Sequence, residues 1–344
     1  MLKTSKTKNT STSLFRAPAI GLLMLLVTGC SQALVNSPMD RMQASNDRDW
    51  APEFGRVPNV SLRDDGVMQL NNIRNFNWVT AEDFVVEYYD HEFLLEDIQS
   101  VDFIVVPFNN APLLAHTMLS FGMSDGRWLA ISIETRREAG EKYSAILGAG
   151  RQFELIYIVA DERDLIRLRT RHRDSDVYVY PTIATPRQAQ QLFVDVMDRA
   201  NKLAAEPEFY HSVSNNCTTN LAAHVNTVAD DRILYNWKVL LPGFSAQYAY
   251  DLGLLPQEIP FEDLQALSLV NELAEDHYDD PDFSFRIRSG RERINRLIER
   301  QQQRNPVLNA RGAQYLESQN PRQAGRSGNS GMIFGRPLFE RLRR

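Results

Sequence analysis

The chain has 344 residues, of which 43% are hydrophobic and 24% are charged, and its net charge is −6. These values exclude a collagen-like chain, a wholly disordered chain, a polytopic membrane protein and a chain that is basic throughout like a nucleic-acid binder. The two cysteines, Cys30 and Cys217, are too few for a disulfide scaffold or a multi-cysteine zinc site, so each needs its own explanation.

The N-terminal segment is typical of a secretory signal. Four basic residues accompany an apolar run of eleven residues, 17–27, which is too short to span a bilayer. The run ends in Val27-Thr28-Gly29-Cys30, which resembles the lipobox of bacterial lipoproteins. The resemblance implies that a signal peptide, residues 1–29, is removed and that a diacylglyceryl group is attached to Cys30. The alternative is an ordinary signal peptide, or an uncleaved anchor, with an incidental cysteine.

Ser31 follows the predicted lipidation site. In Gram-negative lipoproteins, a residue other than Asp at this position generally directs the protein to the outer membrane. We therefore expect a cell-envelope protein that is lipid-anchored at the periplasmic face of the outer membrane. No later run of 18 apolar residues occurs, so lipidated Cys30 is expected to anchor the mature chain without a membrane span.

The mature chain divides into a polar start and a folded part. Residues 30–70 are rich in Ser, Asn, Asp and Pro and predict a flexible tether. Beyond them, aromatic and β-branched runs predict strands, and apolar residues at helical spacing then predict helices. The predicted strands are 84–89, 101–106, 115–121, 128–133, 153–159 and 177–180, and the predicted helices lie between Pro186 and Pro207 and over 217–228, 261–274 and 289–303. Strands followed by helices predict an α+β domain over residues 71–285.

The last segment, residues 286–344, differs from the rest in charge. It contains 14 arginines and four glutamates, a net charge of +10, so the remainder of the chain carries −16. We predict an Arg-rich helix followed by a disordered tail, because residues 304–335 are rich in Gln, Asn, Gly, Ser and Arg. Such a tail is either simply solvated or attracted to anionic lipid headgroups or other anionic polymers of the envelope.

Cys217 is the only thiol that remains once Cys30 is lipidated. It follows the polar run 211–216 and precedes apolar Leu221 and Ala222, so we expect it in the first turn of a helix. The unpaired N–H groups and the dipole of a helix N-terminus stabilise a thiolate, which is the attacking species in thiol acyl transfer or hydrolysis. The alternative is a buried, inert cysteine.

A nucleophilic thiol needs a base within about 3 Å, and His116 is a candidate because it lies inside an apolar strand and needs a partner there. The turn sequence around Asp125 and Gly126 predicts a hairpin that joins this strand to the one carrying Glu134. A three-residue loop centred on Asp125 places His116 opposite Glu134 on one face, whereas a two-residue turn places them on opposite faces. In the first register Cys217, His116 and Glu134 would supply a thiol, a base and an orienting acid. The structural alternative is a satisfied core histidine beside a salt-bridged Glu134.

Other polar residues have less specific patterns. His224 lies roughly 10 Å from Cys217 along the predicted helix, which is too far for contact. Asn215 and Asn216 are either oxyanion donors that act with the Cys217 N–H or helix caps, and we prefer the cap for Asn215. The alternating charges of residues 161–164 are typical of a surface ion-pair network. We expect no metal and no cofactor, because no ligand spacing, P-loop or dinucleotide fingerprint occurs.

Several blocks of the sequence resemble the bacterial Lnb N-terminal periplasmic domain family. They are residues 115–122 and 131–138, Asp161-Glu162-Arg163-Asp164 and Asn216-Cys217-Thr218-Thr219. The resemblance covers roughly residues 75–285 and implies a circularly permuted papain-like (NlpC/P60-type) fold, in which the histidine strand precedes the cysteine helix. It also implies catalysis by a cysteine, a histidine and an acidic residue, as in the lipoprotein N-acyltransferase of this family. Position by position, Cys217 matches the nucleophile and His116 the base, and Glu134 is the best match to the acid.

We therefore expect a lipid-anchored periplasmic thiol enzyme that forms a thioester and passes the acyl group to an amine or to water. Lipids or lipoproteins are its expected substrates, and no nucleic acid is expected as a partner. Two alternatives stay open. One is a peptidoglycan amidase or endopeptidase of the NlpC/P60 type, and the other is a non-catalytic lipoprotein that binds envelope partners through its arginine-rich tail.

Overall fold

The computed structural model describes residues 43–143, 148–229 and 232–304. The predicted signal peptide, the predicted lipidation site Cys30 and the tail beyond residue 304 lie outside the described residues. Within these described ranges, none of the helices has the length and apolar character that crossing a bilayer requires.

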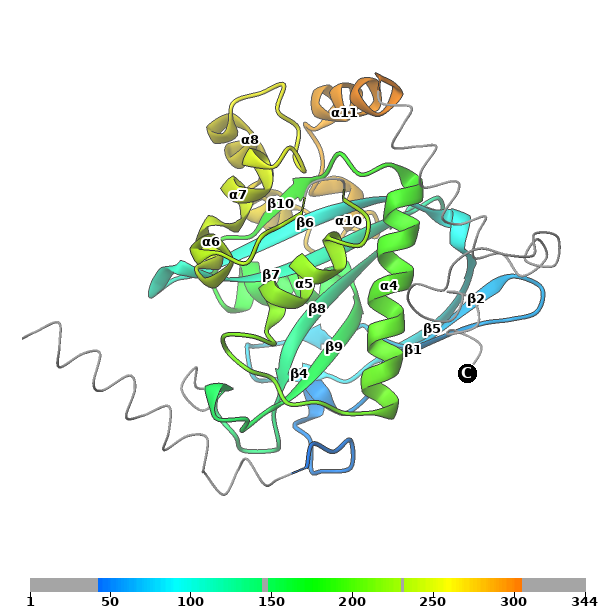
Figure 1. The fold of residues 1–344 in the computed structure, drawn as a ribbon, viewed down its shortest axis with the longest axis vertical. Helices are drawn as coiled ribbons and strands as arrows, with labels where there is room; N and C mark the ends of the chain where they lie inside the picture. Colours follow the sequence, from blue (N-terminus) through cyan, green and yellow to red (C-terminus); the bar gives the residue numbers. More distant parts are fainter. Residues whose placement is uncertain (1–42, 144–147, 230–231, 305–344) are drawn as a thin grey trace, which may run out of the picture. The chain divides into compact units, whose positions relative to one another are not determined.

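A mixed sheet of eight strands organises the fold (Figure 1). Its strands are β1 (Asn59–Leu62), β2 (Val67–Arg74), β5 (Tyr88–Leu94), β6 (Ile98–Phe108), β7 (Ala111–Met123), β8 (Trp128–Arg136), β9 (Glu154–Asp161) and β10 (Tyr178–Pro181). Their order is β1-β2-β9-β8-β7-β6-β10, and β5 also pairs with β2. The β2–β9 pair is parallel and the other pairs of this sheet are antiparallel. A separate two-stranded sheet is formed by β3 (Asn77–Trp78) and β4 (Phe84–Val85).

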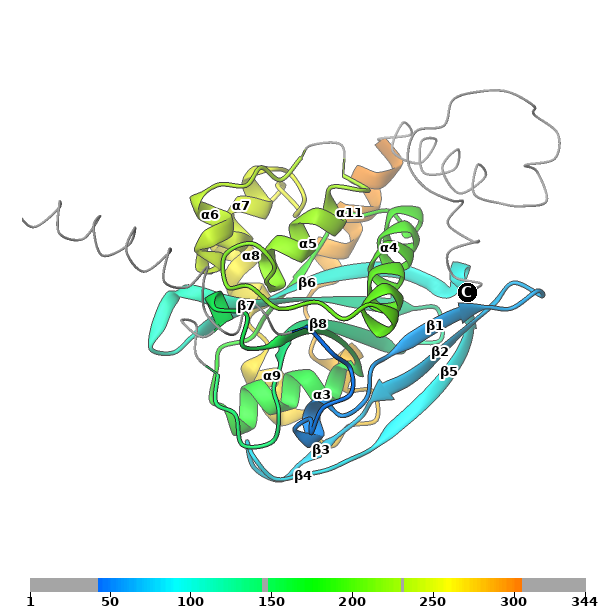
Figure 2. The same cartoon turned by 60° about the horizontal axis from the view of Figure 1, so that its bottom comes forward.

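Helices cover both faces of the large sheet, as Figure 2 shows, with α4 and α5 on one side and α3 and α9 on the other. The α-helices of the described ranges are α3 (Glu162–Arg167), α4 (Pro186–Ala205), α5 (Cys217–Val225), α6 (Trp237–Leu240), α7 (Ser245–Asp251), α8 (Phe261–Ser268), α9 (Asn271–Asp276), α10 (Phe283–Arg286) and α11 (Glu292–Arg304). Short 3₁₀ segments are η2 (Pro52–Phe54), η3 (Leu95–Asp97) and η5 (Pro242–Phe244), and a π-helical turn, η4 (Leu168–His172), follows α3. This combination of a sheet with helices confirms the predicted α+β class.

Side chains that alternate along the central strands form two layers of the core. Leu119 and Ile131 belong to the layer that contains Phe193 of α4 and Leu221 of α5. Their neighbours on the opposite face, such as Met118, belong to the layer that contains residues of α3, α9 and α10. The sheet therefore supports α5, which carries Cys217, on a rigid apolar layer.

The tether prediction is wrong for much of the part of residues 30–70 that the structure describes. Residues 59–62 form β1 and residues 67–70 begin β2, and the two strands pair with each other. Met68 and Leu70 are completely buried. These two residues alternate with outward-facing neighbours, which is the pattern of a half-buried strand within an otherwise polar segment.

Two predicted elements are interrupted. The predicted strand 84–89 is divided between β4 and β5, and the predicted helix 261–274 is divided between α8 and α9. At the second break the Val270 N–H donates to the Val177 carbonyl oxygen at 3.0 Å, and Leu269 forms a bridge with Tyr178. Backbone groups that would hydrogen-bond within a continuous helix therefore bond to the edge of the sheet instead.

The folded body extends beyond the predicted domain limit at residue 285. Ile287, Ile294 and Ile298 are buried, and α11 corresponds to the predicted helix 289–303. Part of the basic segment therefore packs into the domain rather than belonging to a separate tail.

The acidic run 161–164 is not the surface network that its charge pattern predicts, because Glu162 and Asp164 have fully buried side chains. Asp164 accepts from Arg74 Nε at 2.8 Å and from the indole N–H of Trp78 at 2.8 Å. Glu162 accepts from Arg288 Nη2 at 2.6 Å. Each buried carboxylate is thus compensated by a residue distant in sequence, which local spacing does not indicate.

Candidate active site

The hairpin between β7 and β8 has the three-residue loop centred on Asp125 that its turn residues predict. Met123 closes the loop, and its N–H donates to the Arg127 carbonyl oxygen at 2.9 Å. Asp125 accepts from the Arg127 N–H at 3.0 Å, and Gly126 has a φ of 87°, which glycine adopts at little cost. The loop determines which residues of the two strands face each other.

The resulting register brings His116 and Glu134 together. The last paired residues of β7 and β8 are Met118 and Ser132, so His116 and Glu134 follow on the same face two residues further along each strand. His116 Nε2 lies 3.3 Å from Glu134 Oε1 and 2.7 Å from Ser132 Oγ. The register expected for these two residues is confirmed.

Ser132 bridges the histidine and the carboxylate. Its hydroxyl donates to Glu134 Oε1 at 2.6 Å, so its oxygen accepts from the Nε2–H of His116. Glu134 also accepts from Arg169 Nη2 at 3.0 Å. These contacts orient the imidazole and leave Nδ1 as the ring nitrogen that faces other groups. Neither Ser132 nor Arg169 is predicted from the sequence, although Ser132 shares the strand face of Glu134.

Helix α5 carries Cys217 at its first position, as expected. Asn216 caps the helix: its side-chain oxygen accepts from the Thr219 N–H at 2.9 Å, and its own N–H donates to the Thr219 hydroxyl at 2.9 Å. These reciprocal bonds form a capping box that defines the start of α5. The N–H of Cys217 has no acceptor among the described residues, as is usual for the first turn of a helix.

Both asparagines before Cys217 have structural partners. Asn216 Nδ2 donates to the Ser212 carbonyl oxygen at 2.7 Å, and Asn215 Nδ2 donates to the Phe209 carbonyl oxygen at 2.9 Å. The preference for Asn215 as the cap is wrong, since Asn216 is the cap. Of the two, Asn216 lines the cavity that contains the thiol.

Strand β7 and helix α5 meet at the thiol. Because the β7–β8 pairing stops at Met118, the N–H of Thr117 is free to donate to the Cys217 sulfur. The Thr218 hydroxyl lies 3.7 Å from Cys217 Sγ and 3.4 Å from the Thr117 hydroxyl. The imidazole of His116 also interacts with the Cys217 thiol and lowers its pKa, so three groups from two elements surround the sulfur.

The charges at the site favour a thiolate paired with an imidazolium. Burial raises the pKa of Cys217, but the hydrogen bond and charge of His116 oppose it and lower the pKa to about 7. Burial lowers the pKa of His116, but the charge of Glu134 and hydrogen bonds to Cys217 and Glu134 raise it to about 9. Burial raises the pKa of Glu134, but His116 and Arg169 hold it well below its usual range. The thiol therefore loses its proton at a lower pH than the imidazolium does.

Cys217, His116 and Glu134 line one cavity of about 480 Å³. Four arginines line it as well: Arg74, Arg137, Arg169 and Arg173. The first three are paired with carboxylates. The side chain of Arg173 forms no ion pair or hydrogen bond with any residue that the structure describes. Burial lowers the pKa of Arg173, and the charge of Glu134 nevertheless acts on it and opposes this larger effect. Within the described residues, Arg173 thus supplies the thiol cavity with a guanidinium that is not paired with a carboxylate.

His224 lies on α5 but outside the thiol site, as its helical spacing predicts. Its Nδ1 is 2.6 Å from Asp195 Oδ2 on α4, and its Nε2 is 2.8 Å from the Tyr157 hydroxyl on β9. These bonds fasten α5 to α4 and to the sheet. No group of three or more His, Cys, Asp or Glu side chains in the described ranges is arranged to hold a metal ion.

Residues 85–252 match the family model described as the Lnb N-terminal periplasmic domain. The matched range includes His116, Glu134 and Cys217. No curated protein sequence and no solved structure matches the chain.

Proposed function

Residues 85–252 form a domain of the Lnb N-terminal periplasmic family, and we propose on this basis that the chain is a cysteine-dependent acyltransferase of the bacterial cell envelope. The observation that carries the proposal is the convergence of Cys217, His116 and Glu134 in one cavity, with the pKa of the thiol below that of the histidine. Lipids or lipoproteins are the proposed substrates.

In the first half-reaction, the Cys217 thiolate attacks the carbonyl carbon of an ester. A C–S bond forms, and the carbonyl electron pair moves to oxygen, where the free N–H of Cys217 would stabilise the negative charge. The tetrahedral species then collapses and the C–O bond breaks. His116 gives its proton to the leaving oxygen, so an alcohol departs and a thioester remains on Cys217.

In the second half-reaction, neutral His116 takes a proton from an attacking amine. A C–N bond forms, the C–S bond breaks, and the sulfur leaves as the thiolate beside the newly protonated imidazole. The product is an amide, and the enzyme returns to its starting state. Water in place of the amine would give a carboxylic acid, which is the hydrolase form of the same chemistry. Ser132 and Glu134 would hold the imidazole plane throughout.

We further propose a permuted papain-like fold of the NlpC/P60 type. Three observations support it: the histidine strand precedes the cysteine helix, the thiol lies at a helix N-terminus, and that helix packs on an antiparallel part of the sheet. The polar partner of the histidine comes from the adjacent strand.

The envelope location is supported by the family, and anchoring through lipidated Cys30 at the periplasmic face of the outer membrane remains part of the proposal. If the basic segment binds anionic polymers, it must do so through residues other than Arg288 and Arg291. Both side chains are buried in ion pairs with Asp102, at 2.9 Å and 3.0 Å.

A peptidoglycan amidase or endopeptidase is the second candidate. The arginines around the thiol cavity favour it, because the carboxylates of wall peptides would pair with an uncommitted guanidinium such as that of Arg173. Wall fragments incubated with the purified chain would release new amines only if this candidate holds.

The test of the acyltransferase uses the full chain with Cys30→Ala, whose only thiol is Cys217. After incubation with p-nitrophenyl butyrate, intact mass spectrometry should detect one butyryl adduct that hydroxylamine removes. The Cys217→Ala variant should show none. An adduct of equal yield in Cys217→Ala, or no adduct at any pH between 6 and 10 in the parent chain, would rule out the thioester mechanism.

A further inference from the structure

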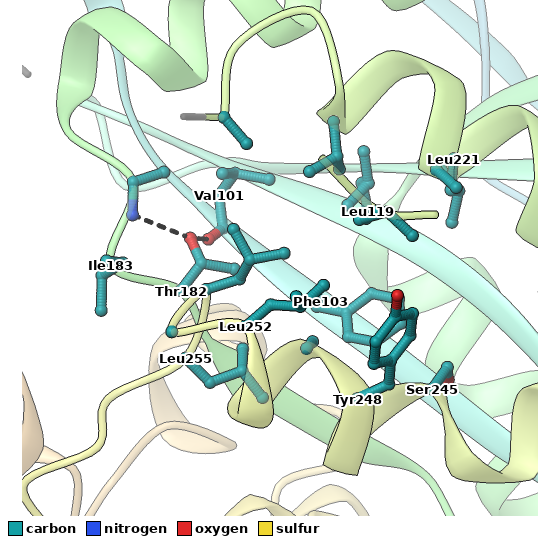
Figure 3. A pocket seen from close by; sticks show the side chains of 18 of the residues that line it. Val101, Phe103, Leu119, Thr182, Ile183, Leu221, Ser245, Tyr248, Leu252 and Leu255 are labelled. Atoms are coloured by element: carbon teal, nitrogen blue, oxygen red, sulfur yellow. Dashed lines mark hydrogen bonds between the residues drawn. The ribbon is translucent and has the colours of Figure 1, made fainter. Parts of the chain in front are cut away.

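A second cavity, of about 520 Å³, adjoins the thiol site and is predominantly apolar (Figure 3). Side chains from β6, β7, α5 and the region of α7 surround it; among them are Phe103, Leu119, Leu221, Tyr248 and Leu252. Its volume lies within the roughly 300–1,000 Å³ typical of ligand pockets and is far larger than the voids of a close-packed core.

The polar groups at this cavity have partners within the protein, with one exception. Thr182 donates its hydroxyl to the Val101 carbonyl oxygen at 2.7 Å, and Lys238 pairs with Asp251 at 2.8 Å. The exception is the buried Ser245 Oγ, which has no hydrogen-bond partner among the described residues. A charged or strongly polar ligand would therefore find few hydrogen-bonding partners in the cavity to replace those it has in water. A hydrocarbon chain makes no hydrogen bonds in water and would lose none on entering.

One face of α5 connects the cavity to the thiol. Thr218, Leu221, Ala222 and Val225 all line the cavity, and their spacing places them along a single stripe of the helix. The stripe begins at Thr218, the residue directly after Cys217. Thr218 and Val239 line both this cavity and the one that contains the thiol, so the two spaces share a wall, and the Thr218 hydroxyl in that wall lies 3.7 Å from Cys217 Sγ.

We propose that this cavity holds the hydrocarbon chain of the acyl group that Cys217 receives, a role that rests on the proposed function. With its carbonyl carbon at Cys217, an unbranched chain would continue past Thr218 along the α5 stripe. A polar headgroup would remain in the arginine-lined cavity on the other side of the thiol. The donor is therefore an ester of a long-chain fatty acid.

The surface beside the cavity supports a lipid source. Leu234, Tyr235, Trp237 and Leu240 are exposed large hydrophobic side chains, and they flank Lys238 and Val239 of the cavity wall. A run of exposed Leu, Tyr and Trp is typical of a segment that enters the interfacial region of a bilayer. It would place the cavity next to the membrane from which the chain is taken.

The test measures thioester formation with p-nitrophenyl esters of four to sixteen carbons, again in the Cys30→Ala chain. The rate should rise by up to about fourfold per methylene until the cavity is filled and then level off. Ala222→Phe, which adds a ring to the cavity wall, should shift this limit to shorter chains. The matched control is Ala223→Phe at the exposed next position of α5, which should keep the parent profile. Ala249→Phe fills the opposite wall and should repeat the shift if Ala222→Phe fails to fold.

A binding measurement separates failure of this proposal from failure of the proposed function. In Cys217→Ala, which cannot form a thioester, palmitate binding should weaken when Ala222→Phe is added and should stay the same when Ala223→Phe is added. Thioester formation that is indifferent to chain length, with palmitate binding equal in both double variants, overturns the cavity assignment and leaves the thiol chemistry intact. Selective loss of palmitate binding without any thioester in the parent chain supports the cavity and overturns the acyltransferase.

Discussion

Replacing His116 with alanine should raise the pKa of Cys217 by about two units. His116 contributes most to offsetting the burial of the thiol, and together with the Thr117 N–H and the Thr218 hydroxyl it holds the pKa at about 7 against an ordinary value of 9.0. Two units correspond to about 2.7 kcal/mol of lost stabilisation of the thiolate. The thiolate fraction at pH 7 would fall from about half to about 1%, so a reaction that requires the thiolate should slow by roughly 50-fold.

The assay is the rate of alkylation by iodoacetamide between pH 5 and 10, measured on the chain with Cys30→Ala. The parent should show a midpoint near 7, and His116→Ala a midpoint near 9. The control is His277→Ala, because that histidine is paired with Asp280 in the segment after α9 and does not line the thiol cavity. A midpoint that stays near 7 in His116→Ala would show that groups other than His116 lower the pKa, and the ion-pair reasoning would be refuted.

Three further substitutions test residues that position the candidate site or stabilise the fold. Glu134→Gln removes the charge that raises the pKa of His116 from its usual range to about 9, so the alkaline limb of the activity–pH profile should move to lower pH; an unmoved limb contradicts this. Asn216→Ala removes the cap of α5 and should lower the free energy of unfolding in urea by about 1 kcal/mol. An unchanged free energy of unfolding would show that the cap is dispensable. Arg288→Ala leaves the buried carboxylate of Glu162 without a cationic partner, whereas Asp102 keeps Arg291, and it should lower the free energy of unfolding in urea by about 3–5 kcal/mol. Exposed Arg286→Ala should change it little, and equal effects of the two substitutions would refute the buried network.

The geometry of the candidate site could be predicted in large part because its determinants are local in sequence. The turn around Asp125 and Gly126 sets the register of one hairpin, and that register brings His116 to Glu134. The polar residues before Cys217 likewise indicate a helix start. Both inferences depend on backbone rules that act over fewer than ten residues.

The remaining features depend on contacts that are distant in sequence. Arg74 and Asp164 pair across 90 residues, and Arg288 reaches Glu162 across 126. A pattern of alternating charges looks the same whether its partners are water or buried arginines, so the sequence alone predicts a surface network for residues 161–164. The same argument applies to Arg169, whose pairing with Glu134 depends on how the turn after α3 packs beneath the sheet.

Helix α5 links the candidate thiol site to the proposed chain cavity through its fixed position. Its N-terminus holds Cys217 and one of its faces lines the apolar cavity, while His224 on another face is bound to Asp195 and Tyr157. A shift of α5 by one residue along its axis would move the sulfur by about 1.5 Å. Misplacement of a reacting group by about 1 Å can cost a hundredfold in rate. The His224 bonds resist such a shift, so the same clamp would keep the sulfur near His116 and keep the stripe that begins at Thr218 aligned with the cavity.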